Sequence, residues 1–519
     1  MGVRISQTNF HLLIGAGFTL LAVVGAAMLV FAPTLQQLTY FWLLLLFAAL
    51  VAALMVRRWL KGEFDWFEPG VFIAIVYVVF FGLAGLRYVM DPTLLHPFLQ
   101  ADQRWLTLAL FFVLLGVVAF WAGYYGRLGP ALHRLTLRPA REQARARASI
   151  RSGAVVGLYA LGLLARLFML RAGLYGYLRD PESYASVPYA EFFVRLEAFC
   201  GYALVLAWLD SYSHPGHKWR RSFAWGLLLS EMFWGFFSGM KMNVILPLLL
   251  VAMIHTYKRA RLPLRHVAVA LALVVLIYPV NTIYRQLVRG GELEIRGPAD
   301  MLSSSPQLLE EVLINFDDPN MYMETGYQAA LGRASVIQNY ALLLKYLDRT
   351  GDYWHGRYLW LLPALVVVPR VVWPSKPVAN IGTWFAVNVW GQDPHIQSSV
   401  AITFPGDLHL QFGWPSLLVG MFLTGVVFRW LYERYARPRS DYSIFFYIFL
   451  FYHLGAHEAD LTFKVAGLVR LFLILFAVSL IVFRYPRLVH APQPSPEPAL
   501  ARAGNAPWTR RAQIPDAGR

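Results

Sequence analysis

Long apolar runs separated by short polar segments are the main feature of this 519-residue chain. A helix that spans a bilayer needs about 20 mostly apolar residues. Runs that approach or reach this length cover 12–32, 38–56, 70–90, 105–125, 153–170, 192–210, 222–238, 243–257, 266–283, 413–432, 442–456 and 465–483. The pattern predicts an all-α polytopic membrane protein with about 12 transmembrane helices. The first run exceeds the roughly 7–15 apolar residues of a signal peptide, so it is expected to be retained.

The spacing of the runs divides the chain into four regions. Residues 1–283 contain predicted transmembrane helices 1–9, and residues 413–483 contain helices 10–12. Residues 284–412 lie between spans 9 and 10 and are too long for an ordinary connection, because structureless loops beyond about 15 residues are uncommon. This region is expected to be a large helical domain. Residues 484–519 are rich in Pro, Ala and Arg and are expected to form a disordered tail.

The distribution of lysine and arginine predicts the orientation of the spans. Positive charge accumulates in short cytoplasmic loops. One set of alternate loops contains 21 Lys and Arg residues, whereas the opposite short loops contain seven. The basic set comprises 57–69, 124–152, 211–221, 258–265 and 429–441. Both termini are therefore expected to be cytoplasmic, and residues 284–412 are expected to lie on the opposite, outer side of the membrane.

Composition supports a lipid environment. The chain is 58% hydrophobic and 15% charged, whereas soluble proteins carry about 25% charged residues. The net charge of +16 comes mostly from arginine. Because cytoplasmic loops attract this charge and anionic lipids tolerate it, we interpret it as a membrane feature and expect no nucleic-acid partner. The single cysteine, Cys200, excludes a disulfide within the chain.

Helical signals recur within residues 284–412. Ser305 followed by proline is typical of a helix start. Residues 327–348 carry apolar side chains at helical spacing, and Gly351 is expected to end that helix. The apolar run 359–372 has fourteen residues. Because it is too short to span, it is expected to be re-entrant or interfacial.

Basic residues are frequent on the predicted outer side, where orientation does not require them. Those of the large domain include Arg285, Arg289, Arg333, Arg357, Arg370 and Lys376, and Lys241 lies in a short external turn. Guanidinium groups bind phosphate through two parallel hydrogen bonds, and a departing diphosphate needs such a cationic environment. The alternative is that these residues form ordinary salt bridges with carboxylates of the same domain.

Asp407 and His409 are the first candidates for acid–base chemistry, since they lie just before the tenth span. Being two residues apart, they share one face only if the segment is extended. The alternative for His409 is a hydrogen-bonded structural role.

A second group of polar residues lies at the outer end of span eleven. His453 and His457 have i, i+4 spacing, which places both imidazoles on one face of a helix, as a metal site needs. No third ligand follows from the spacing, so no metal or other cofactor is predicted. The more favoured interpretation is a polar cluster that includes Glu458 and Asp460, with Lys464 balancing the carboxylates.

Two charged residues interrupt apolar helices. Arg166 and Glu231 lie within predicted spans, where an unpaired charge costs roughly 2.5–3.5 kcal/mol on insertion scales. They are expected to face the interior of the bundle and to pair with each other.

Several segments from span seven onward resemble the bacterial O-antigen polymerase (Wzy-type), or oligosaccharide-repeat-unit polymerase, family. They are Phe237-Ser238-Gly239-Met240-Lys241, Tyr284-Arg285, Arg333-Ala334-Ser335, the segment from Pro369 to Pro377, and Gly406-Asp407 with Phe412-Gly413. The fourth is similar to the family's Pro-Arg-x-x-Trp-Pro-x-Lys-Pro. The last is similar to its Gly-Glu…Phe-Gly entry to a span. The chain departs from the family at Asp407, where Glu is common, and at His409, where an aromatic residue is common.

The resemblance implies a C-type membrane glycosyltransferase that acts on the periplasmic side. Such an enzyme moves a growing glycan from undecaprenyl diphosphate onto another lipid-linked repeat unit. Asp407 or His409 would then orient or deprotonate the acceptor hydroxyl. The diphosphate would be bound by Arg370, Lys376, Arg285, Arg333, Lys241 and Arg289. The expected partners are undecaprenyl-diphosphate-linked oligosaccharides, membrane lipids and a regulator of chain length.

Three other functions stay open at this point. An O-antigen ligase, or another lipid-linked glycan transferase, would differ only in its acceptor. A transporter or flippase for the same lipid-linked sugars is disfavoured because no internal repeat is detectable in the sequence. A non-catalytic scaffold is disfavoured by the concentration of arginine on one predicted face.

Overall fold

The computed structural model describes residues 34–137, 139–176, 189–259, 280–288, 305–316, 336–357, 381–395 and 399–486, together with a few isolated positions. Several predictions lie outside the described residues. These are the first and ninth spans (12–32 and, for the most part, 266–283), nearly all of the interfacial segment 359–372, and the tail beyond residue 486.

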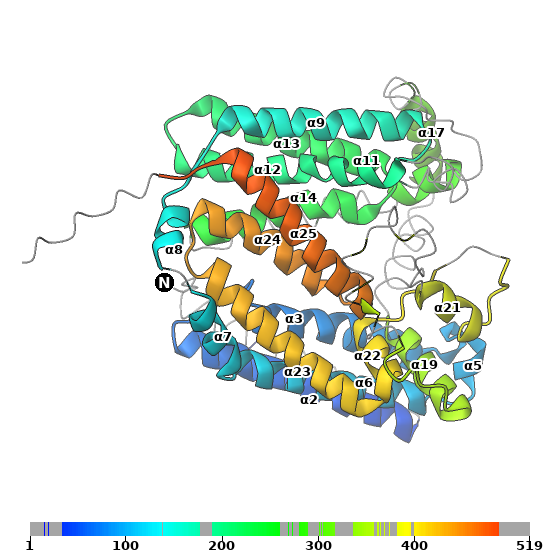
Figure 1. Cartoon of the computed structure of the whole chain (residues 1–519). Coiled ribbons are helices and arrows are strands. Elements are labelled where there is room, and N and C mark those ends of the chain that lie inside the picture. Colours follow the sequence, from blue (N-terminus) through cyan, green and yellow to red (C-terminus); the bar gives the residue numbers. More distant parts are fainter. Residues whose placement is uncertain are drawn as a thin grey trace, which may run out of the picture.

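Helices make up nearly all of the described structure (Figure 1). The N-terminal part contains α2 (Leu35–Leu60), α3 (Pro69–Tyr77), η1 (Val78–Gly82), η2 (Leu83–Gly85), α4 (Leu86–Met90), η3 (Pro92–Leu94), α5 (Pro97–Gln100), α6 (Arg104–Tyr125), α7 (Leu128–Thr136) and α8 (Pro139–Ala146). The middle part contains α9 (Ser152–Arg171), α11 (Ala190–Glu197), α12 (Phe199–Ser213), α13 (Lys218–Phe237), α14 (Lys241–Arg259) and α17 (Ser305–Phe316). The C-terminal part contains α19 (Ile337–Thr350), α21 (Ile381–Asn388), α22 (Phe404–Phe412), α23 (Trp414–Leu431), η5 (Tyr432–Ala436), α24 (Asp441–Gly455) and α25 (Leu461–Val482). One short antiparallel pair joins β1 (Ser149–Ile150) to β2 (Phe483–Arg484).

Seven helices within the described residues are long and apolar enough to cross a membrane. They cover Leu35–Leu60, Pro69–Met90, Arg104–Tyr125, Ser152–Arg171, Phe192–Ser213, Trp414–Ala436 and Leu461–Val482. Each coincides with a predicted span, so the chain is an all-α, multi-pass membrane protein. The spans predicted at 222–238, 243–257 and 442–456 are also helical, as α13, α14 and α24.

The predicted start of one helix and the predicted end of another are confirmed in the large domain. α17 begins at Ser305, at the serine–proline signal. α19 ends at Thr350, and Gly351 follows it with φ 65°, a left-handed conformation that glycine adopts without steric cost.

The described parts of the five basic loops lie at one end of the bundle, on the left in Figure 1. Tyr432 donates to Asp65 across 3.0 Å, and Arg434 pairs with Glu142 at 2.7 Å. Asp441 pairs with Lys258 and accepts from Ser213. These bonds join five loops that are far apart in the sequence. The opposite end carries α5, α19, α21 and α22.

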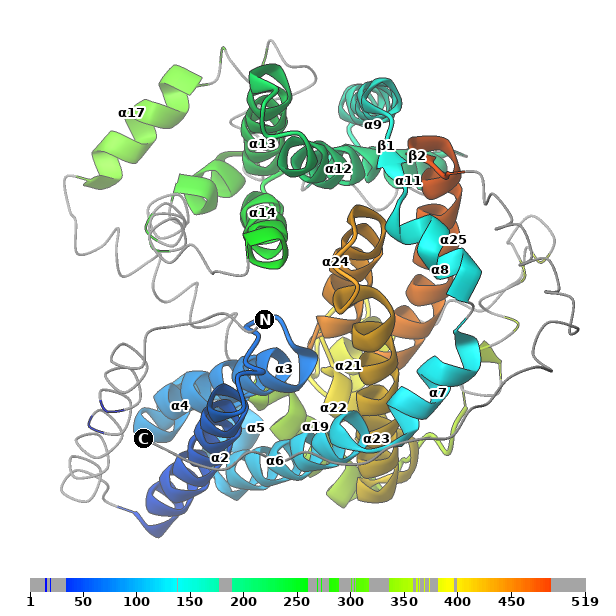
Figure 2. The ribbon, with the colours of Figure 1, turned by 90° about the vertical axis from the view of Figure 1, so that its left-hand side faces the viewer.

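Viewed from the end with the basic loops, the helices form two groups (Figure 2). One contains α9 and α11–α14, and the other contains α2, α3, α6, α19 and α23. α24 contacts α12 and α14 in the first group and α3 and α23 in the second. Its residues 442–451 are all buried. A helix that is apolar on every side belongs in the interior, and α24 therefore connects the two groups.

Close packing of α6 against α23 depends on glycine. A Cβ at Gly123 would lie 2.0 Å from the carbonyl oxygen of Phe422, and one at Gly425 would lie 2.1 Å from that of Phe120. Small residues at such crossings let helix backbones approach closely in membranes. The resemblance to O-antigen polymerases gives no indication of this contact, because the resemblance begins at span seven and α6 lies before it.

Replacing Gly425 by alanine is expected to lower the free energy of unfolding by about 1–3 kcal/mol, because the new methyl meets backbone that has no room to move. The matched control is Gly157→Ala on α9, where no atom lies within 4 Å of the added Cβ. Thermal unfolding of the purified variants in detergent measures the difference. Equal melting temperatures for the two variants would contradict the close crossing.

Candidate functional site

The short helix α22 lies at the end of the bundle opposite the basic loops (Figure 1). It begins after Thr403, whose φ is 70° and whose hydroxyl accepts from the backbone N–H of Gly406 at 3.2 Å. Pro405 suits the first turn, where an N–H is not needed. The backbone N–H of Phe404 donates to the carbonyl of His457 at 2.9 Å. α22 is thus fixed both by its own cap and by the turn before α25.

Asp407 and His409 do not form a pair. The segment is helical rather than extended, and two residues along a helix rotate a side chain by about 200°. Asp407 faces the start of α25, whereas His409 faces α6 and α19. The extended segment that a shared face would require is therefore not present.

Asp407 is a buried carboxyl group with 2% exposure. Its Oδ2 accepts from the backbone N–H of Leu461 at 2.7 Å, and its Oδ1 accepts from the side-chain amide of Gln411 at 2.8 Å. Leu461 opens α25, so Asp407 satisfies one of the free N–H groups of that helix. Burial, aided by the charge of Asp460, raises the pKa of Asp407 to about 6 despite these two hydrogen bonds.

His409 is held in a packed environment. Its Nδ1 lies 2.9 Å from the hydroxyl of Tyr340, and its ring meets the edge of Phe112 with centroids 4.9 Å apart. Burial lowers its pKa to about 4, so the imidazole is neutral at neutral pH. These contacts favour the structural interpretation of His409, as a link between α22, α6 and α19.

The turn between α24 and α25 holds the second predicted group of polar residues. α24 ends at Gly455, so His457 lies beyond the helix and shares no helical face with His453. His453 contacts the carbonyl of Lys464 at 3.0 Å, and Asp460 caps α25 by accepting from Phe463. In the described part of the chain, no group of three or more His, Cys, Asp or Glu side chains is arranged to hold a metal ion.

The structure joins the two predicted groups into one site. Lys464 is buried, donates to the carbonyl of Leu454 and lies 4.6 Å from the ring centroid of Phe404 at the start of α22. Together with the Asp407–Leu461 bond, this contact places α22 against α25. We call this site the α22–α25 cluster, and it consists of Asp407, Gln411, His457, Asp460 and Lys464.

Two buried atoms of the α22–α25 cluster have no hydrogen-bond partner among the described residues. They are Oε1 of Gln411 and Nε2 of His457. Gln411 was not predicted as a site residue, although its position one helical turn after Asp407 is the signal that identifies it. The cluster therefore combines a buried carboxyl group whose pKa is raised to about 6 with two buried polar atoms that no described residue binds.

The predicted phosphate-binding residues are only partly described. Lys241 opens α14, and Arg285 belongs to the helical segment 280–288. Tyr284, next to Arg285, donates to the carbonyl of Phe237 at 2.9 Å, so this segment packs on the turn that precedes Lys241. Arg289, Arg333, Arg370 and Lys376 lie outside the described residues.

The predicted pairing of Arg166 with Glu231 is confirmed. Two hydrogen bonds of 2.9 and 3.1 Å join the guanidinium to the carboxylate. Glu197 approaches the same guanidinium at 3.6 Å, and Trp234 stacks beside it. Glu197 was not predicted as a partner of Arg166, because it lies before the most apolar part of its span.

Residues 188–451 match a family model described as a domain of unknown function, DUF8712. This is more than half of the chain. The chain belongs to the DUF8712 family. No curated protein and no solved structure matches it. The DUF8712 match includes α22 with Asp407 and Gln411 and ends within α24. The other three members of the α22–α25 cluster, His457, Asp460 and Lys464, follow the matched region.

Proposed function

We propose that this DUF8712 protein is a glycosyltransferase that polymerises undecaprenyl-diphosphate-linked oligosaccharide repeat units at the periplasmic face of the inner membrane. The observation that carries the proposal is the environment of Asp407. A buried carboxyl group with a pKa of about 6 lies opposite the basic loops. It belongs to the segment that resembles the Gly-Glu…Phe-Gly motif of O-antigen polymerases.

The reaction requires a base and a cationic site. A hydroxyl oxygen of the acceptor sugar forms a bond to the anomeric carbon of the donor, and the bond from that carbon to the diphosphate breaks. The hydroxyl proton passes to the base, and the diphosphate leaves as an anion. A base works best when its pKa lies near the working pH. This favours Asp407, with a pKa of about 6, over His409, whose pKa is lowered to about 4 by burial.

Gln411 is suited to orienting the acceptor. Its side-chain amide donates to Asp407, while its Oε1 has no partner among the described residues. A sugar hydroxyl that donates to this oxygen would lie beside the carboxylate. Arg370, Lys376, Arg333, Arg289, Arg285 and Lys241 are proposed to bind the diphosphate, because guanidinium and ammonium groups stabilise charge on a departing phosphate.

The proposal includes the finer topology: twelve spans, cytoplasmic termini and a periplasmic domain at residues 284–412. Its support is that the five basic loops share one end of the bundle while α22 lies at the other. Because positive loops face the cytoplasm, this arrangement supports a periplasmic position for the α22–α25 cluster.

The test incubates the purified protein in nanodiscs with a matching undecaprenyl-diphosphate repeat unit and resolves the products on a gel. A ladder of lengthening glycans is expected, and Arg370→Ala is expected to remove it. The control is Arg349→Ala, an exposed position in the last turn of α19 at the same end of the bundle.

Other outcomes would replace the proposal. Transfer of a completed glycan to a lipid A core, without a ladder, would identify a ligase. Protein-dependent movement of the lipid-linked repeat unit across a vesicle bilayer, again without a ladder, would identify a transporter.

A further inference from the structure

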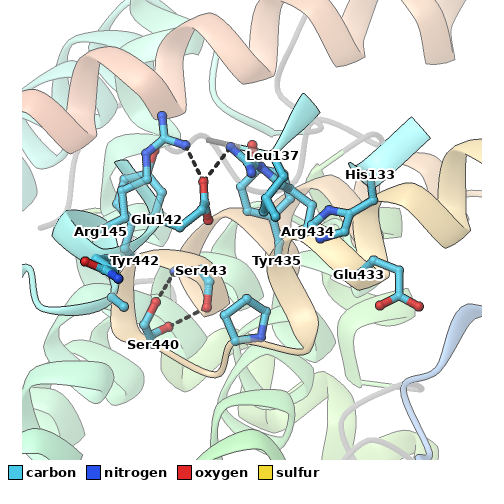
Figure 3. A pocket seen from close by; sticks show the side chains of 13 residues that line it. His133, Leu137, Glu142, Arg145, Glu433, Arg434, Tyr435, Ser440, Tyr442 and Ser443 are labelled. Atoms are coloured by element: carbon cyan, nitrogen blue, oxygen red, sulfur yellow. Dashed lines mark hydrogen bonds and ion pairs between the residues drawn. The ribbon is translucent and has the colours of Figure 1, made fainter. Parts of the chain in front are cut away.

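A cavity of about 260 Å³ lies at the end of the bundle where the basic loops gather (Figure 3). It is bounded by α7 and α8 on one side and by the turn between α23 and α24 on the other. The resemblance to polymerases and the α22–α25 cluster account for none of the residues that line it. The lining includes His133, Leu137, Arg145, Arg434 and Ser440.

The charged residues that line the cavity are two arginines, Arg145 and Arg434, and two glutamates, Glu142 and Glu433. Glu142 lies between Arg434 at 2.7 Å and Arg145 at 3.3 Å. Glu433 pairs in the same way with two arginines, Arg429 at 2.6 Å and Arg437 at 2.8 Å. Arg429 and Arg437 lie outside the lining, but their ion pairs offset the charge of Glu433. With both carboxylates paired to arginines, the site is suited to an anion.

Two buried nitrogen atoms beside the cavity have no hydrogen-bond partner in the described part of the chain. They are Nη1 of Arg434 and Nδ1 of His133. The side chain of Arg434 is only 10% exposed, so water outside the protein has little access to it. A buried donor without a partner is costly, and an anionic oxygen in the cavity would satisfy the guanidinium.

An exposed apolar stripe adjoins the cavity. Leu128, Leu132 and Leu135 are exposed on α7 at i, i+4 and i+7, and Leu135 reaches 84%. They lie on one face of the helix. Leu137 follows this stripe in the sequence, is also exposed, and lines the cavity.

The orientation of α7 is fixed by two contacts with α23. The indole N–H of Trp430 donates to the hydroxyl of Thr136 at 3.0 Å. Gly129 leaves no space for a Cβ, which would lie 2.6 Å from the side chain of Arg429. A helix with leucines on one face and arginines nearby, fixed beside a tryptophan, is typical of the membrane interface.

We infer that this cavity binds the phosphate of an anionic phospholipid in the leaflet that the basic loops face. The phosphate oxygens accept from Arg434 and from the hydroxyl of Ser440, and the acyl chains lie along the leucine stripe of α7. A soluble phosphate compound would use the same donors but would leave the leucines uncovered. The stripe therefore favours a lipid.

The experiment measures lipid retention by native mass spectrometry of the full chain in detergent. Phosphatidylglycerol, phosphatidylcholine and inorganic phosphate are added in separate titrations. Phosphatidylglycerol is expected to bind more tightly than the other two. Arg434→Gln is expected to weaken its binding about tenfold, because one charge-assisted hydrogen bond is lost. Arg104→Gln removes an ion-paired arginine at the opposite end and should leave binding unchanged.

A second variant keeps the inference testable if Arg434→Gln does not fold. Leu135→Ser alters only an exposed side chain. It is expected to weaken the binding of phosphatidylglycerol without affecting the binding of inorganic phosphate. Equal binding of phosphatidylcholine would overturn the inference. So would inorganic phosphate binding as tightly as phosphatidylglycerol, since the ligand would then be soluble.

Discussion

Asp407→Asn is expected to slow glycan extension about 100-fold or more while the protein still folds, because general bases contribute roughly 10²–10⁴ to rate. Asparagine has nearly the same shape, and its carbonyl oxygen can still accept from Leu461. It cannot take the proton of the acceptor hydroxyl. The gel assay described above measures the rate of chain extension. Asp393→Asn is the matched control, since Asp393 is exposed and accepts from the backbone N–H of His395.

The pH profile distinguishes a base from a structural carboxylate. Since the pKa of Asp407 is about 6, the rate of the wild-type protein should rise as pH increases through that value and then level off. Asp407→Asn should lose this rise. A variant that retains the rise, or that loses activity only in proportion to folded protein, would show that Asp407 is structural.

The same pKa has an opposite consequence for stability. The pKa of Asp407 is raised in the folded protein, so folding favours the protonated form. Its contribution to stability is fully present below the ordinary value of 3.8 and is lost as pH rises through about 6. Activity and stability thus depend on pH in opposite directions, as in other sites where a buried group is kept for its chemistry.

Breaking the Arg166–Glu231 pair is expected to have the largest effect on stability. Both residues are buried, with exposures of 6% and 7%. Arg166→Met leaves two carboxylates, Glu231 and Glu197, near one another without the guanidinium. Removing one partner of a buried ion pair costs about 3–5 kcal/mol. Thermal unfolding and the yield of folded protein in detergent measure this loss.

The double variant Arg166→Met/Glu231→Met is the decisive comparison. Removing both charges leaves apolar side chains of suitable length, and such replacements are often neutral or stabilising. The double variant is therefore expected to be more stable than Arg166→Met alone. If it is equally unstable, the packing of the arginine stem rather than the ion pair holds α9 against α13.

Sequence patterns identified the helices well because their apolar runs are long. The end of α19 at Gly351 and the start of α17 at Ser305 follow from local backbone preferences, which can be predicted from the residue types alone. The Arg166–Glu231 pair was predictable since two opposite charges in lipid have few other partners. These features depend on neighbours in sequence or on the cost of burying charge.

The candidate site was harder to predict because it depends on packing between distant segments. Asp407 and Asp460 are more than fifty residues apart, and contacts such as the bond from Leu461 to Asp407 bring them together. The metal interpretation required a helix through His457, but Gly455 ends it, as glycine commonly does. The helical state of α22, which separates Asp407 from His409, has a local signal in Thr403 and Pro405.

The crossing of α6 and α23 also has a consequence for how the protein is made. Gly123 and Gly425, which allow the contact, are separated by about 300 residues. Chains are synthesised at roughly 5–20 residues per second, so the ribosome adds the second glycine about 15–60 s after the first. During that interval the glycine surface of α6 faces lipid or the insertion machinery. The group of helices that contains both α6 and α23 can be completed only after most of the chain has entered the membrane.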